Sequence, residues 1–316
     1  MGIFHDWNVI FSFYKKNTII IFKYPLILMI VYVIGLICLL LILLLLNKTT
    51  EGFMAQDKPF IWLYWENKKG VHEPPNYIKM CHESANLHCG EDFNVVILNE
   101  NSVKTYLHDL RDDINKLEIP QKADYIRLKL LEKYGGIWLD SDIIVMRSLL
   151  PIMSKMKHNI DFVGFGCHSR NCKRSGKPKP ANWVMASKPN TKFMNMCIEE
   201  CNTVLDKPDK IKYFDLGRNL LWKKIKEIKK LDPSWDYYHY DSKCLDRDSN
   251  YNKIRNKRLI SEEPIDKRCI NESLFIPIYN TAPGFPDWFK NKSRKEILDD
   301  NMLISKIFRK CLFKNN

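Results

Sequence analysis

The sequence has no internal repeat and little glycine or proline. Its 12 glycines and 15 prolines are too few for a collagen-like or low-complexity chain of 316 residues. Its ten cysteines are too sparse for a small disulfide scaffold, and their spacings match neither a CxxC redox motif nor a zinc ribbon. Fibrous, disordered and disulfide-stapled proteins are therefore excluded. A hydrophobic content of 45% is enough for a sizeable folded core.

Acidic residues are in deficit. Asp and Glu number 37 against 50 Lys and Arg, which gives a formal net charge of +13. Such a surplus suits nucleic acid, anionic lipid or phosphorylated substrates, and a general enrichment in lysine is the alternative explanation. The sequence contains no helix-turn-helix, zinc-finger or RNP-like motif, so nucleic acid is not an expected partner.

One segment lacks charge altogether. Residues 26–46 form an apolar run of 21 residues, and about 20 are needed to cross a bilayer as a helix. A cleaved signal peptide would have a shorter apolar region of about 7–15 residues, so we predict a transmembrane signal anchor. The positive-inside rule favours a cytoplasmic N-terminus, because three lysines precede the run: Lys15, Lys16 and Lys23.

The anchor divides the chain. We expect a cytoplasmic tail (1–25) before it, a polar stem (47–58) after it and then one large domain (59–316). The lipid bilayer is thus an expected partner. Two Asn-x-Ser/Thr sequons, at Asn271 and Asn291, lie in the large domain, where they would be open to glycosylation if that domain is lumenal.

Short apolar runs alternate with helical segments along the large domain. Such alternation predicts an α/β fold with a mainly parallel sheet. No structure is assigned to the polar residues 206–260. The expected strands are 60–65, 93–98, 137–139, 143–145, 161–166, 182–187 and 274–279, and the expected helices are 74–88, 120–134, 190–205 and an amphipathic 293–312.

A pair of carboxylates follows the expected strand 137–139. Asp140 and Asp142 are two positions apart, and in an extended segment such positions project to the same face. Two carboxylates on one face are hard oxygen ligands, which suit Mg²⁺ or Mn²⁺ and a bound diphosphate. The alternative is a solvated turn at the end of a strand, where aspartate is common.

A second charged pair lies on the preceding helix, 120–134. Asp124 and Arg127 are three residues apart and point away from the solvated face made by Lys129, Glu132 and Lys133. They could grip the hydroxyls of a sugar. They could equally form a helix ion pair that contributes about 0.2–0.5 kcal/mol.

These motifs together resemble a known family. KADYIRLKLLEKYGGIWLDSDIIV (122–145) is similar to the DXD sugar-binding region of glycosyltransferases of the capsular polysaccharide synthesis type and of family 32. IWLYWEN, PPNYIKMC and NWVMAS resemble flanking segments of that family, so the resemblance runs from about Pro59 to Pro189. It implies a GT-A fold, which is a single Rossmann-like α/β catalytic domain over 59–316.

The resemblance also implies roles. Asp140 and Asp142 match the DXD aspartates, which would hold Mn²⁺ or Mg²⁺ and, through the metal, the nucleotide diphosphate. Asp124 and Arg127 match the helix pair that binds the donor sugar. Asn182 matches an asparagine near the donor sugar and acceptor, so it joins the two aspartates as an expected catalytic residue.

Two further site residues are expected. Trp65 matches the tryptophan that ends the first strand of the family, where it would stack on the nucleotide base; core packing is the alternative. His239, within DYYHYD, could be a third metal ligand from the C-terminal part, although a lone histidine among tyrosines is more often structural.

The expected function is therefore transfer of a hexosyl unit from a UDP- or GDP-linked sugar to a glycan, glycoprotein or glycolipid acceptor, with retention of configuration. The expected location is the Golgi or ER membrane, as a single-pass type II protein with a lumenal catalytic domain. A haloacid-dehalogenase-like phosphatase is one alternative, but Ile144 stands where its motif has Thr or Val. A membrane-anchored glycan-binding protein without enzyme activity is the other.

Overall fold

The computed structural model divides into two compact units, Met1–Asp57 and Lys58–Asn316. It describes residues 30, 32–39, 58–156, 160–166, 180–207, 210–240, 256–265, 273–278, 280–281 and 285–313. In the first unit the described residues are helical and exposed. None of the described helices is long and apolar enough to cross a membrane. The predicted tail, most of the anchor, nearly all of the stem and Asn271 lie outside the described residues, so those expectations stay predictions.

A six-stranded sheet forms the centre of the second unit. Its order is β2-β1-β3-β6-β5-β7, and β4 and β8 form a separate two-stranded sheet. The pairs β1–β2, β1–β3 and β5–β7 are parallel, whereas β3–β6 and β5–β6 are antiparallel. The sheet is thus mixed and mainly parallel, as predicted. The strands are β1 (Phe60–Tyr64), β2 (Asn94–Leu98), β3 (Gly136–Asp140), β4 (Ile143–Val145), β5 (Ile160–Phe165), β6 (Ala181–Ser187), β7 (Asp236–Tyr240) and β8 (Phe275–Pro277).

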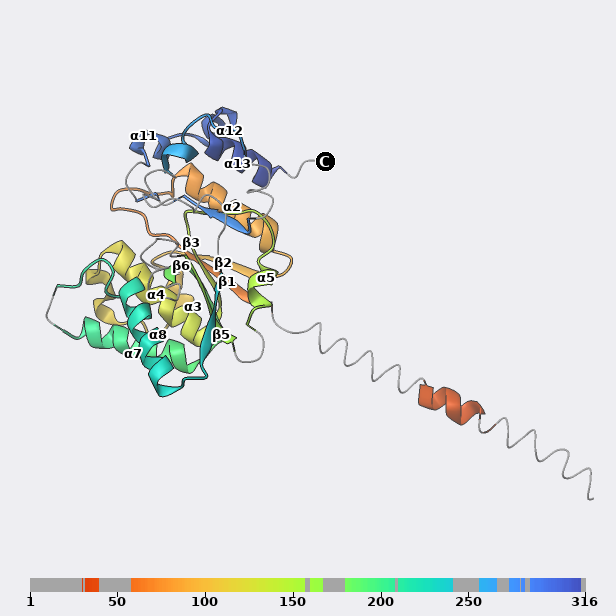
Figure 1. Cartoon of the computed structure of the whole chain (residues 1–316). Coiled ribbons are helices and arrows are strands. Elements are labelled where there is room, and N and C mark those ends of the chain that lie inside the picture. Colours follow the sequence, from red (N-terminus) through yellow and green to blue (C-terminus); the bar gives the residue numbers. More distant parts are fainter. Residues whose placement is uncertain are drawn as a thin grey trace, which may run out of the picture. The chain divides into compact units, whose positions relative to one another are not determined.

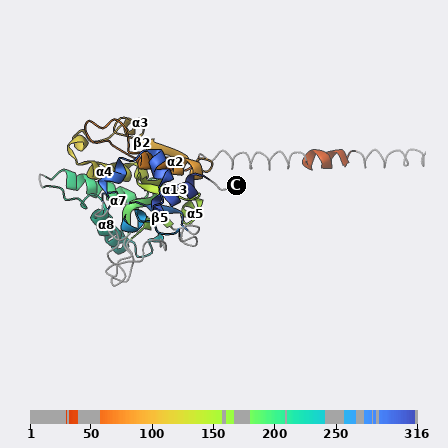
Figure 2. The same cartoon turned by 90° about the horizontal axis from the view of Figure 1, so that it is seen from above.

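Helices cover both faces of this sheet (Figure 1). On one side lie α4, α7 and α8, and on the other lie α2 and the C-terminal helices; Figure 2 gives the view from above. The helical elements are α2 (Asn76–Cys89), α3 (Val103–Tyr106), the 3₁₀ segment η1 (Asp112–Lys116), α4 (Ile119–Tyr134), α5 (Leu150–Met153), α7 (Lys192–Leu205), α8 (Arg218–Leu231), α11 (Asp287–Lys290), α12 (Arg294–Asp299) and α13 (Leu303–Leu312).

The alternation of β1 shows how the sheet supports both layers. Trp62 and Tyr64 belong to the apolar cluster under α4, α7 and α8. Ile61 and Leu63 belong to the cluster on the opposite face, under α2 and β4. Successive side chains of a strand point to opposite faces, so an apolar run of this kind is buried on both sides.

A Gly-Gly turn joins α4 to β3. Gly135 and Gly136 have φ angles of 65° and 93°, a region that glycine adopts readily and residues with a Cβ rarely do. A Cβ on Gly136 would lie 2.3 Å from the carbonyl oxygen of Phe60. The turn therefore lets β3 start directly beside β1. In this register Tyr64 lies opposite Asp140, so both strands end at the same edge of the sheet.

Three expectations about the elements were wrong or incomplete. The amphipathic segment 293–312 is two helices, α12 and α13, because the backbone is extended at Asp300 and Met302. The strand 143–145 forms as predicted, but its sheet was not specified: it pairs with β8 in the small sheet. The unassigned 206–260 contains α8 and β7.

Candidate functional site

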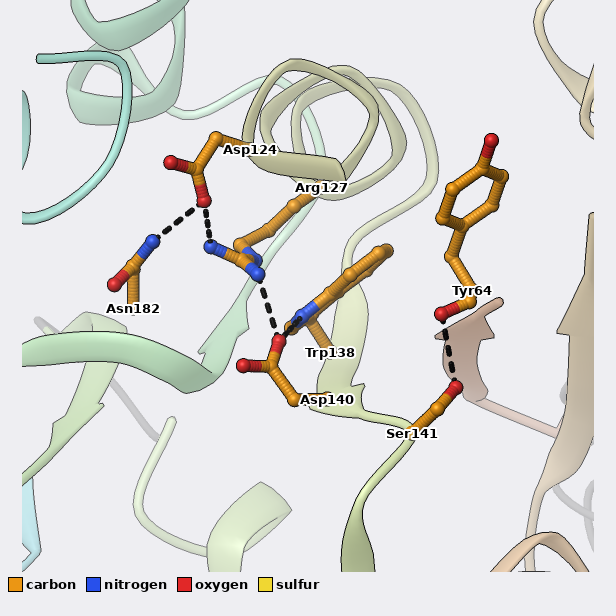
Figure 3. A network of polar contacts seen from close by, with 7 residues as sticks. All are labelled: Tyr64, Asp124, Arg127, Trp138, Asp140, Ser141 and Asn182. Carbon is orange, nitrogen blue, oxygen red and sulfur yellow. Dashed lines mark hydrogen bonds and ion pairs between the residues drawn. The ribbon is translucent and has the colours of Figure 1, made fainter. Parts of the chain in front are cut away.

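Arg127 links two carboxylates at the carboxyl end of β3. One guanidinium nitrogen, Nη2, donates to Asp140 Oδ1 at 2.7 Å, and the other, Nη1, forms an ion pair with Asp124 Oδ1 (Figure 3). Asp124 and Arg127 both project from α4, whereas Asp140 ends β3. The Gly-Gly turn brings the helix back over the strand. The two motifs that the sequence analysis treated separately therefore meet.

Two more side chains extend this network. Asn182, on β6, donates from Nδ2 to Asp124 Oδ1 at 2.6 Å. Trp138, on β3, donates from Nε1 to Asp140 Oδ1 at 2.8 Å, and the Arg127 guanidinium lies 4.8 Å from the centre of the Trp138 ring system. Four of the predicted site residues, Asp124, Arg127, Asp140 and Asn182, are thus connected. We call these four residues and Trp138 the Arg127 network.

In the Arg127 network, Asp124, Arg127 and Trp138 are buried and Asp140 and Asn182 are partly exposed, and carboxylates outnumber the single cation. Asp124 and Arg127 are only 6% and 4% exposed. Burial raises the pKa of Asp124 to about 6; the Arg127 charge opposes this shift and the Asp140 charge adds to it. Burial also raises the pKa of Asp140, against the attraction of Arg127. With two carboxylates and one guanidinium, the ionised network has a net charge of −1, which a cation would balance.

Asp142 has different neighbours from Asp140. Residues 141 and 142 form a turn, so the alternation of an extended strand does not continue through them. Ser141 is buried and donates to the carbonyl oxygen of Tyr64 at 2.9 Å. Asp142 Oδ2 accepts the backbone N–H of Asn280 at 2.9 Å, on the C-terminal segment. The second aspartate of the motif is therefore held by the chain that follows β8.

The candidate metal ligands lie apart from His239. Within the part of the chain that the structure describes, no group of three or more His, Cys, Asp or Glu residues is arranged to hold a metal ion. His239 lies on β7 at the edge of the sheet, where its Nε2 is 2.5 Å from the Gly166 carbonyl oxygen. The structure thus does not gather His239 with Asp140 and Asp142 into such a cluster.

Trp65 follows β1 and is only partly buried. Its Nε1 donates to Asn67 Oδ1 at 2.7 Å, and its ring packs against the apolar cluster of α2 and the C-terminal helices. The contact with the cluster accounts for core packing, and the exposed part of the ring is available for stacking. Its role at a nucleotide stays a prediction.

A buried ion pair next to Trp65 in the chain was not predicted from the sequence. Lys122 Nζ is 2.8 Å from Glu66 Oε1, and these side chains are 9% and 15% exposed. Tyr64 donates its hydroxyl proton to Glu66 Oε2 at 2.6 Å. Lys122 lies within the motif of residues 122–145, and Glu66 directly follows Trp65. Their positions in these two segments were the only indication in the sequence that they belong near the site.

The segment that leads into α8 was not predicted to belong to the site either. A Cβ on Gly217 would lie 2.4 Å from Asn182 Nδ2 and 2.6 Å from Asp124 Oδ2. The start of α8 therefore packs directly on two residues of the Arg127 network. The lone Gly217, in a region with no assigned element, gave no signal of this contact.

Comparisons with known proteins agree with the motifs. A family model described as capsular polysaccharide synthesis protein matches residues 45–267, which is more than two thirds of the chain. None of the curated proteins matches the sequence.

Several solved structures are similar. PaToxG glycosyltransferase has 17% identity and a TM-score of 0.39, over 56% of this chain and 72% of its own. The glycosyltransferase GlyE of Streptococcus pneumoniae has 10% identity and a TM-score of 0.42, over 82% of this chain and 61% of its own. The galactosyltransferase LgtC, solved with donor and acceptor sugar analogues, has 16% identity and a TM-score of 0.35, over 52% and 70%. At such low identities and TM-scores, these likenesses carry no argument about the substrate.

Proposed function

This chain belongs to the capsular polysaccharide synthesis family of glycosyltransferases, and on that premise we propose that it transfers a hexosyl unit from a UDP- or GDP-linked sugar to a glycan, glycoprotein or glycolipid acceptor. The proposal includes a GT-A catalytic domain and retention of configuration. The observation that carries it is the Arg127 network, in which a single buried guanidinium joins Asp124 to Asp140. A phosphatase would have no use for Asp124 and Asn182 in this arrangement.

Asp140 and Asp142 are the proposed ligands of Mn²⁺ or Mg²⁺. The donor chemistry fits, because both are carboxylates and hard divalent cations prefer oxygen ligands. Asp140 is 33% exposed, and both of its hydrogen bonds end on Oδ1, so Oδ2 is the oxygen that a metal can reach. The metal would neutralise charge on the diphosphate leaving group.

Asp124, Arg127 and Asn182 are the proposed contacts of the donor sugar. Asp124 Oδ1 already accepts from Asn182 and Arg127, which fixes its orientation. Its Oδ2 lies against Gly217, where a Cβ would be only 2.6 Å away. A carboxylate oriented in this way can accept hydrogen bonds from the hydroxyl groups of a sugar without reorganising. The ionised form is needed for this role.

The remaining assignments follow the sequence. Trp65 is proposed at the nucleotide base, and the apolar run 26–46 as an anchor in the Golgi or ER membrane with a lumenal catalytic domain. Asn291 is exposed, as a glycosylated residue must be. Protease protection in sealed microsomes tests this topology. Digestion of the large domain without detergent would show that the orientation is opposite to the proposed one.

A donor-hydrolysis screen tests the proposed activity. The purified full-length protein is incubated with UDP- and GDP-linked hexoses, with and without Mn²⁺, and release of the nucleoside diphosphate is measured. We expect hydrolysis of one donor class only, and only with metal. Asp112→Asn, which changes an exposed carboxylate on η1, is the control and should behave as wild type. Hydrolysis that is equal with and without metal would contradict the assignment of Asp140 and Asp142.

A further inference from the structure

Arg218 follows the glycine that packs against the proposed sugar site. Arg218 is the first residue of α8 and directly follows Gly217, which packs on Asp124 and Asn182. Its guanidinium lies 3.9 Å from the centre of the Phe214 ring and 5.0 Å from that of Trp222. Cation–π contacts of this kind hold a guanidinium in place without using its N–H groups.

The N–H groups of Arg218 are not otherwise matched to an acid. Among the described residues no carboxylate pairs with Arg218, and its buried Nε has no hydrogen-bond partner. Burial lowers the pKa of Arg218, and no neighbouring acid opposes that shift. Arg127, by contrast, pairs with two carboxylates. A buried donor without a partner is unfavourable, and an oxyanion bound at Arg218 would remove that cost.

Two exposed aromatic residues border the same place. Tyr213 and Phe214 are 55% and 42% exposed, and their rings meet edge to face with centres 4.8 Å apart. Both residues belong to the turn that leads through Gly217 into α8, and Gly217 packs on Asp124 and Asn182. Exposed aromatic faces pack well against the apolar faces of sugar rings. Aromatic faces next to an unpaired cation therefore suit a sugar that carries a negative charge.

We propose that Arg218, Tyr213 and Phe214 form an acceptor subsite for a sugar bearing a carboxylate or a phosphate. The planar guanidinium would bind two oxygens of the anion side by side, and the aromatic rings would cover the sugar. This inference rests on the proposed function, because the subsite adjoins the place assigned to the donor sugar at Asp124 and Asn182. It adds the chemical class of the acceptor, which the family and the motifs leave open.

Binding of small probes tests the subsite without requiring turnover. Glucuronate, glucose 6-phosphate and neutral glucose are titrated by NMR into the full-length protein with Mn²⁺ and a nucleoside diphosphate. We expect the two anionic probes to bind about tenfold to hundredfold more tightly than glucose. Arg218→Met should remove this difference, and Arg218→Lys should restore only part of it, because an ammonium lacks the planar fork.

Lys295→Met is the matched control. It removes one positive charge from an exposed position on α12 and should leave every affinity unchanged. Thermal melting of each variant shows whether it folds, and Arg218→Gln replaces Arg218→Met if the latter does not.

Two results would overturn the proposal. The first is an unchanged preference for the anionic probes in folded Arg218→Met. The second is a loss of affinity for free UDP or GDP, which would assign Arg218 to the diphosphate of the donor. Failure of the transferase assignment looks different: the wild type would turn over no nucleotide-sugar, while its Arg218-dependent probe binding could still be measured.

Discussion

Helices α4 and α8 cover the same face of the sheet and both pack on α7, yet their charged residues are arranged differently. Two cations of α4 are buried and paired within the protein: Lys122 with Glu66, and Arg127 with Asp124 and Asp140. Because Glu66 follows β1 and Asp140 ends β3, these pairs join α4 to two other elements.

The lysines of α8 are of two kinds. Lys223 and Lys224 pair with Glu200 on α7, and Lys229 pairs with Asp236 on β7. Lys226 and Lys230 are exposed, one turn apart on one face. They line a cleft of about 370 Å³ with Trp222 and Glu227. Like charges four residues apart destabilise a helix slightly, so these lysines add nothing to the fold. The buried pairs of α4 thus join elements around the Arg127 network, whereas α8 adds two exposed lysines to its salt bridges with neighbouring elements.

The largest expected effect is that of Asp140→Asn on transfer. Asparagine can still accept from Arg127 and Trp138, so the fold should persist, but the charge needed at the metal is lost. We expect the rate to fall about 10²–10³-fold, with a melting temperature close to wild type. Initial rates and thermal melting measure this. Full activity would remove Asp140 from the metal site, and Asp112→Asn controls for a general effect of charge.

Arg127→Ala tests whether α4 links stability to catalysis. Arg127 is proposed at the sugar, so turnover should fall about 10- to 100-fold while affinity for UDP or GDP with Mn²⁺ changes little. Two carboxylates would lose their common partner, which should lower the free energy of unfolding by about 3–5 kcal/mol. Calorimetric titration with the nucleotide, beside chemical denaturation, measures both. Near-normal transfer with a small loss of stability would make Arg127 an ordinary helix ion pair.

The pH dependence of stability tests the burial of Asp124. Its pKa is raised from 3.8 to about 6 in the folded protein, so between these values the folded state binds more protons than the unfolded state. Stability should therefore fall as the pH rises from about 4 to 6 and then level off, by about 3 kcal/mol. Denaturation curves of wild type and Asp124→Asn at several pH values isolate this contribution. A difference that stays constant with pH would contradict the raised pKa.

Gly217→Ala is expected to have the smallest effect, and it probes the contact between the two helices. The new Cβ would press on Asn182 and Asp124, and overpacking of this kind costs about 1–3 kcal/mol. Turnover should fall as well, because the displaced groups belong to the Arg127 network. Lys230→Met, on the exposed face of α8, is the control. Unchanged activity would separate α8 from the sugar site.

The sequence predicted α4 well and α8 not at all, and the reason lies in where their contacts come from. Asp124, Arg127 and Asp140 fall within one continuous motif, and the Gly-Gly turn between them can be recognised from composition alone. In α8 the pattern of six cations in 14 residues hides the apolar positions that pack on the sheet. Only the fold shows that Gly217 lies against Asp124. The pairing of Asp142 with Asn280 was equally out of reach, because it joins residues 138 positions apart.

The predicted helix 293–312 shows a second limit of prediction from sequence. The hydrophobic pattern of α12 and α13 fits one continuous helix, since apolar spacing is the same in both. The extended backbone at Asp300 breaks it, and Arg309 Nη1 donates to the Asp300 carbonyl oxygen at 2.7 Å. Periodicity identifies helical segments but does not show that two of them are separated by a tertiary contact of this kind.

The Gly-Gly turn also bears on the order in which the site forms during folding. The bond from Arg127 to Asp140 spans 13 positions of the chain, that from Asn182 to Asp124 spans 58, and that from Asn280 to Asp142 spans 138. Contacts between positions close in sequence need less loop closure and form faster. We therefore expect α4, the turn and β3 to assemble first, as a local unit that already holds the guanidinium against its carboxylate. Asn182 would join this unit later, and the C-terminal segment would join last. The proposed contacts of the donor sugar would therefore be in place before Asp142 gains its hydrogen bond from Asn280.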